Sequence, residues 1–158
     1  MGPWKVPKRK RLGNTPLRVT QQKLPVLQRL GRFSQLPSIV CGQCQQGIET
    51  QEHLFFGCHY AREIWDIFLS EWQLQIQVDG MKNFVKSVTH LKMPRKMRNL
   101  MYAGINAVLY NLWHARNSRI FSGKVYPSQD VLKEIKRQVT HRVLQLHQLR
   151  VCVQFVSD

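Results

Sequence analysis

Apolar residues recur along most of this chain at the three- and four-residue spacing of amphipathic helices. A short helix is expected around Val26–Phe33, and the β-branched stretch 151–156 leaves its secondary structure open. Gly123 and Pro127 mark a loop, and Ser128 is a candidate helix N-cap. Four longer helices are predicted: from Cys58 to Trp72, from Met81 to Leu91, from Pro94 to Arg119, and from Ser128 to Leu146. The pattern therefore predicts a mainly α fold, with Trp65 and Trp113 on apolar stripes that favour burial over base stacking.

The first 25 residues differ from the rest because they carry four prolines, the run Lys8-Arg9-Lys10-Arg11 and little apolar periodicity. Proline keeps such a segment extended. We therefore predict three parts: an extended basic N-terminal tail (1–25), a helical domain (26–150) and a C-terminal tail (151–158). A nuclear localisation signal, an organelle targeting sequence and a simple disordered tail are alternative interpretations of residues 1–25.

The chain is strongly basic, with a net charge of +15 and a pI of about 10.3, which favours a polyanionic partner such as nucleic acid. Residues 1–48 and 80–129 each hold nine Lys or Arg and no acid, whereas residues 49–79 hold six acids and one Arg. Arg116 has an alternative role in bracing a helix end. The expected nucleic-acid contacts are Lys5, Lys8, Arg9, Lys10, Arg11, Arg18, Lys23, Arg95, Lys96, Arg98, Arg116 and Arg119.

Three cysteines and a histidine form the pattern C-G-Q-C-x8-H-x4-C, at Cys41, Cys44, His53 and Cys58. Thiolate sulfur and imidazole nitrogen suit Zn²⁺, and four protein ligands close its tetrahedral shell. The pattern therefore predicts a structural zinc site, in which Gly42 relaxes the turn between the first two cysteines. His59, beside Cys58, is an alternative ligand with poorer geometry. Because this segment is acidic, we expect zinc to hold the fold together while other surfaces meet nucleic acid.

The stretch from Cys41 to Trp65 resembles the zinc-binding domain of plant non-LTR retrotransposon reverse transcriptases. The matching residues are the C-x2-C pair, Glu49, Thr50, His53, Leu54, Phe55, Cys58, Ile64 and Trp65. A second family-like signature, L-W-x-A-R-N-x-x-I-F, spans Leu112 to Phe121, so the resemblance covers roughly Leu30 to Phe121. A retrotransposon polyprotein would place a polymerase before this region and often a ribonuclease H domain after it. This sequence shows the motifs of neither domain.

The sequence shows no pattern of catalytic residues, since Asp66, Asp79 and Asp130 are too scattered for a two-metal carboxylate site. We therefore expect no enzyme, no small-molecule substrate and, without an eighteen-residue apolar span, no membrane partner. The predicted function is a zinc-stabilised structural RNA-binding component of a large ribonucleoprotein. The expected particle is a plant mitochondrial ribosome, in which the protein would contact rRNA and neighbouring proteins. The alternatives are a fragment or nuclear domesticated derivative of a retrotransposon reverse transcriptase, and a protein–protein adaptor.

Overall fold

The computed structural model describes residues 39–155, and it describes side chains as far as residue 145. This part contains a π-helical turn, η1 (His53–Gly57), and four α-helices: α3 (His59–Glu71), α4 (Met81–His90), α5 (Arg95–Ser122) and α6 (Ser128–Phe155). The mainly α fold is confirmed. The predicted basic tail (1–25), with Lys5, Lys8, Arg9, Lys10, Arg11, Arg18 and Lys23, and the short helix at Val26–Phe33 lie outside the described residues.

Aromatic side chains from three elements form the centre of the core. Trp65 of α3 is fully buried, and its indole N–H donates to the carbonyl of Phe55 at 2.8 Å. The ring centroids of Phe56 and Phe84 lie 6.4 and 5.2 Å from that of Trp65. Because the indole is both enclosed and hydrogen-bonded, Trp65 has a structural role, as its place on an apolar stripe predicts.

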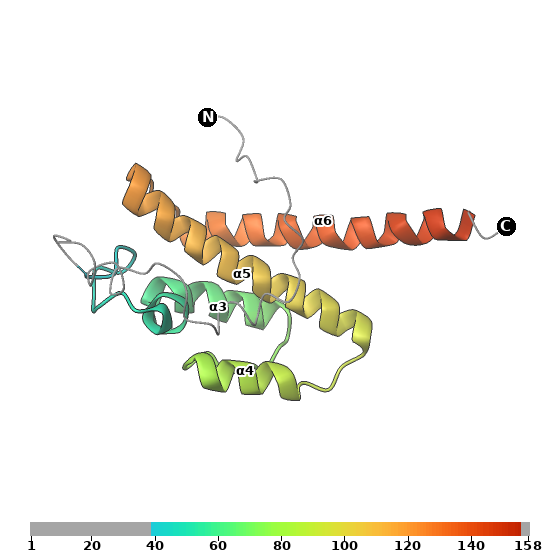
Figure 1. Cartoon of the computed structure of the whole chain (residues 1–158), viewed down its shortest axis with the longest axis horizontal. Helices are drawn as coiled ribbons and strands as arrows, with labels where there is room; N and C mark the ends of the chain where they lie inside the picture. Colours follow the sequence, from blue (N-terminus) through green and yellow to red (C-terminus); the bar gives the residue numbers. More distant parts are fainter. Residues whose placement is uncertain (1–38, 156–158) are drawn as a thin grey trace.

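The long helix α5 packs mainly along α6, and α3 contacts both of these helices (Figure 1). The N-cap of α5 is Pro94, and the helix ends at Gly123, whose left-handed backbone (φ 63°) donates to the carbonyls of the last turn. Met101, Ile105, Val108 and Leu112 are all buried along its length, so α5 contributes apolar contacts on almost every turn.

The final helix packs through its first half and then continues past the body of the domain (Figure 1). Its buried residues are Val131, Leu132, Ile135 and Val139. Ser128 is the first residue of α6 and not its cap, and its hydroxyl donates to the carboxylate of Glu63 on α3. The helix runs unbroken to Phe155, so the stretch that the sequence left open is helical there, while the division into three parts stays a prediction.

No helix in the described part of the chain combines the length and apolar character that crossing a membrane requires.

We expect Gly104→Ala to destabilise the protein, because a Cβ there would lie 2.7 Å from Phe68 Cζ. Alanine favours a helix by about 1 kcal/mol over glycine, but overpacking a core costs about 1–3 kcal/mol. The Phe68 ring is packed against Trp65 and Trp72 and has little room to move. Urea unfolding should show a net loss of about 1 kcal/mol.

Gly42→Ala is a suitable control, since its Cβ would meet Ile120 at an ordinary 3.7 Å. Equal stability of the Gly104→Ala variant and the wild type would contradict the close approach of α3 and α5.

Candidate metal centre

The first two ligands lie on a tight hairpin turn ahead of η1. The turn is held by hydrogen bonds from the Cys41 amide to the Gly47 carbonyl and from the Gln45 amide to the Cys41 carbonyl, and by a β-bridge between Val40 and Ile48. Left-handed backbone occurs at Gln45 (φ 56°) and Gly47 (φ 73°). Gly42 does not adopt such a conformation, so the flexible position predicted there lies instead at the far side of the turn.

The other two ligands flank the π-helical turn. Five residues span about 140° around an ordinary α-helix, which would point His53 and Cys58 apart. In η1 the Cys58 amide instead donates to the His53 carbonyl, five residues back, at 2.6 Å. This wider turn brings the two positions onto one side, and the Thr50 hydroxyl accepts from the His53 amide at 2.9 Å to cap the segment.

The four ligand atoms of Cys41, Cys44, His53 and Cys58 lie within 4.8 Å of one another. The Cys41 and Cys58 sulfurs are 3.9 Å apart, and Cys44 Sγ is 3.2 Å from His53 Nε2. In a tetrahedral zinc site with Zn–S bonds near 2.3 Å, sulfur atoms are separated by about 3.8 Å. The predicted ligands therefore fit Zn²⁺, and the family match reported below supports the same ion. Four protein ligands would leave no position open for a substrate.

The two buried thiols of Cys41 and Cys58 share a hydrogen bond, and this contact shifts their two pKa values in opposite directions. It lowers the pKa of Cys41 to about 4, helped by backbone hydrogen bonds at Cys44 and Gln43 and opposed by burial. The same contact, with burial, raises the pKa of Cys58. A dication between the sulfurs would replace the shared proton and stabilise both thiolates. The Gln46 amide also donates to Cys44 Sγ, at 3.4 Å.

His59 is exposed and does not belong to the cluster, although it adjoins Cys58. It is the first residue of α3, whereas the ring of His53 lies against the hairpin. The geometry therefore favours His53 over His59 as the nitrogen ligand.

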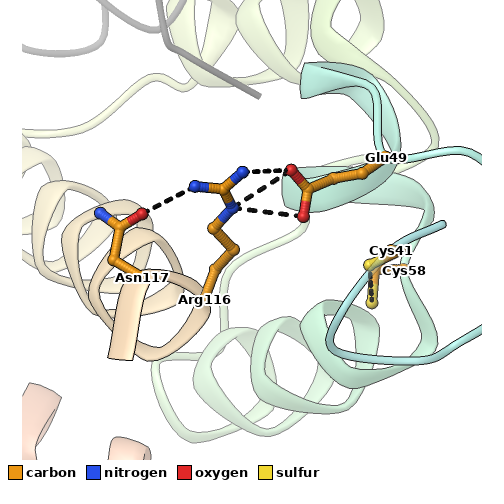
Figure 2. A network of polar contacts seen from close by, with 5 residues as sticks. All are labelled: Cys41, Glu49, Cys58, Arg116 and Asn117. Atoms are coloured by element: carbon orange, nitrogen blue, oxygen red, sulfur yellow. Dashed lines mark hydrogen bonds and ion pairs between the residues drawn. The ribbon is translucent and has the colours of Figure 1, made fainter. Parts of the chain in front are cut away.

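A buried ion pair joins the metal-binding segment to α5 (Figure 2). Glu49 and Arg116 have exposures of 0% and 1%, and the shortest contact, between Arg116 Nη2 and a carboxylate oxygen, is 2.7 Å. Arg116 Nε also donates to Glu49, Nη1 donates to Asn117 Oδ1 at 2.9 Å, and the guanidinium lies 5.0 Å from the centre of the Trp113 ring. Each of the three guanidinium nitrogens thus donates a hydrogen bond to an acceptor within the protein.

The predicted nucleic-acid contact at Arg116 is wrong, because a side chain enclosed in this way cannot reach a phosphate. Arg116 instead has a structural role, because its ion pair with Glu49 joins the metal-binding segment to the last turns of α5. Arg119 is half-buried and its Nη1 donates to the Gln43 carbonyl at 3.2 Å, so it holds the hairpin against α5. Its contact with nucleic acid stays a prediction.

The other predicted basic residues in the described part, Arg95, Lys96 and Arg98, lie far from the metal. They are exposed on the first turns of α5, at the opposite end of the helix from the hairpin (Figure 1). Sequence analysis did not single out Lys82, Lys86 and Lys92, which are also exposed and precede α5 along the chain. These three lysines lie in the acid-free segment 80–129, and that position could have marked them as candidate nucleic-acid contacts.

Comparison with known proteins gives a match over residues 3–65 to a family model described as zinc-binding in reverse transcriptase. All four ligands and Glu49 lie inside the match, whereas the signature around Arg116 lies beyond it. The resemblance seen in the sequence is confirmed for this segment, which is similar to the zinc-binding region of reverse transcriptases. No curated protein and no solved structure matches the chain.

Cys44→Ser should abolish tight zinc binding and the cooperative thermal melt. Zinc ligation in small domains contributes on the order of 10 kcal/mol to apparent folding free energy, and a hydroxyl is a poor replacement for thiolate. Metal content after purification, together with helical circular dichroism during heating, measures both effects. His59→Gln is the matched control and should retain one zinc per chain, whereas His53→Gln should not. Wild-type melting of Cys44→Ser would count against a structural metal.

Removing either partner of the Glu49–Arg116 pair should destabilise the fold strongly. Glu49→Leu or Arg116→Met alone strands a buried charge, which costs about 3–5 kcal/mol. The double variant leaves no charge and should be clearly more stable than the sum of the two single losses predicts. Urea unfolding of all four proteins in the presence of zinc measures this coupling. Additive losses would show that the two side chains do not act as a pair.

Proposed function

We propose that this protein is a non-catalytic, zinc-stabilised RNA-binding component of a large ribonucleoprotein, and that this particle is a plant mitochondrial ribosome. The observation that carries the proposal is that the cations at one end of α5 are used inside the protein, while those at the other end are exposed. At one end, Arg116 and Arg119 bind the metal segment internally; at the other, Arg95, Lys96 and Arg98 are exposed to solvent. Cations presented in this way suit RNA phosphates, whose binding releases counterions.

Several observations support a structural role over a catalytic one. The ligands of the metal centre form a complete shell of four, which suits holding a fold together. In the described residues, two acids of α3 make surface contacts with α6, Glu71 with Lys136 at 2.6 Å and Glu63 with Ser128. The strongly basic segment 1–25 adds a second set of cations for rRNA.

The alternative is a nucleic-acid-binding fragment, or a domesticated nuclear derivative, of a retrotransposon reverse transcriptase. The match to the zinc-binding family model favours it directly, because that family is described by its place in reverse transcriptase. In this case the basic surfaces would bind element RNA in the nucleus. A protein–protein adaptor is a third candidate, in which the charge serves solubility.

The tagged full-length chain should co-sediment with a mitochondrial ribosomal subunit on a sucrose gradient, and it should remain there in moderate salt. Ribonuclease treatment should release it to light fractions, because RNA contacts would hold it in the particle. Arg95→Gln/Lys96→Gln/Arg98→Gln should shift a substantial fraction to light fractions at the same salt.

The charge-matched control, Lys133→Gln/Arg137→Gln/Arg142→Gln, removes three exposed cations from α6 and should sediment like the wild type. Sedimentation at the top of the gradient without ribonuclease would refute the ribosomal assignment. Nuclear accumulation with element RNA would establish the retrotransposon alternative, and ribonuclease-resistant association with a protein would establish the adaptor.

A further inference from the structure

A surface groove of about 650 Å³ lies between α4 and the extended segment that leads into it. One wall carries Gln75 and Gln77, and the other carries Asn83, Lys86, Ser87 and His90. The volume falls within the range of about 300–1,000 Å³ that is typical of small-ligand sites.

The two walls present polar side chains because their opposite faces are needed by the core. On α4, Phe84 and Val88 are buried, which leaves positions 83, 86, 87 and 90 together on another face. In the extended segment, Ile76 is buried while its neighbours Gln75 and Gln77 are exposed, as a two-residue alternation requires. The groove is therefore a consequence of how these two elements pack.

The groove adjoins a cluster of exposed cations. Lys86 lies in its wall, Lys82 precedes it by one helical turn, Lys92 follows in the short link to α5, and Arg95 is the first residue of α5. Two acids lie near the start of α4: the Asp79 carboxylate accepts from the Asn83 side-chain amide at 3.0 Å, and the Glu52 carboxylate accepts from the Met81 backbone amide at 2.7 Å. His90 Nδ1 lies 2.7 Å from the Lys86 carbonyl, which holds the imidazole at the end of α4.

We propose that this groove binds an unpaired nucleotide within a single-stranded RNA. Lys86 and the neighbouring cations would contact phosphates, while the side-chain amides of Gln75 and Gln77 offer both donors and acceptors to a base edge. Leu74, Ile76 and Leu91 supply an apolar surface beneath. A strand leaving the groove would continue along Lys92 and Arg95 toward the start of α5. The inference rests on the proposed RNA binding and names where an unpaired base would enter.

The test uses full-length protein and fluorescence anisotropy, with an unstructured 12-nucleotide RNA and a duplex of the same sequence. Gln77→Leu/Ser87→Leu removes a polar group from each wall and adds bulk at position 87 without changing charge. Because the base would lose hydrogen-bond partners in both walls, this variant should bind the single strand about tenfold more weakly. Its affinity for the duplex should stay within about twofold of wild type, because phosphate contacts are unchanged.

Lys86→Gln should also weaken single-strand binding, whereas Lys133→Gln, an equal loss of charge on α6, should have little effect. Photocrosslinking of a 4-thiouridine-containing strand should label residues 74–91.

The outcomes separate the groove from the wider proposal. A wild-type protein that binds neither RNA would overturn both. If a stably folded Gln77→Leu/Ser87→Leu variant binds the single strand as tightly as the wild type, the groove is not the nucleotide site, although the protein still binds RNA. Should that variant melt early, Lys86→Gln decides, because it alters only an exposed side chain; single-strand affinity equal to that of Lys133→Gln would then refute the groove.

Discussion

The buried pairing of Glu49 with Arg116 ties the metal-binding segment to the helical body. Neither charge could remain in the interior alone, so the carboxylate and the guanidinium must stay together while the domain is folded. This requirement positions the last turns of α5 against the hairpin, where Arg119 reaches the Gln43 carbonyl. The metal ligands and the long helix are therefore parts of one folded unit.

Zinc and the ion pair stabilise this end of the protein in different ways. The metal site closes a segment of eighteen residues, from Cys41 to Cys58, and the same segment buries Leu54, Phe55 and Phe56 in the core. The ion pair then fixes that segment to a helix whose pairing residue lies 67 positions away. Arg116 and Arg119, at this end of α5, make such contacts. The exposed cations Arg95, Lys96 and Arg98 lie at the start of the same helix.

This arrangement has a consequence for binding. Arg116 is buried and Arg119 is half-buried where they contact the metal-binding segment. Because α4 and the link to α5 carry no acid, the proposed phosphate contacts lie on the side of the domain that these elements form. The proposed groove lies on that side, so charge and shape select the same surface.

The sequence alone determined the helices and the ligands of the metal site. Helical periodicity is a local property, as at Phe84 and Val88 of α4, and the ligands fall within eighteen residues, so spacing was sufficient. It could not pair Glu49 with Arg116, because nothing local indicates a contact across 67 positions. It also could not foresee the π-helical turn that brings His53 and Cys58 together, or the groove between α4 and its leading segment. Only tertiary packing decided these features, since each depends on which side chains meet after the helices have docked.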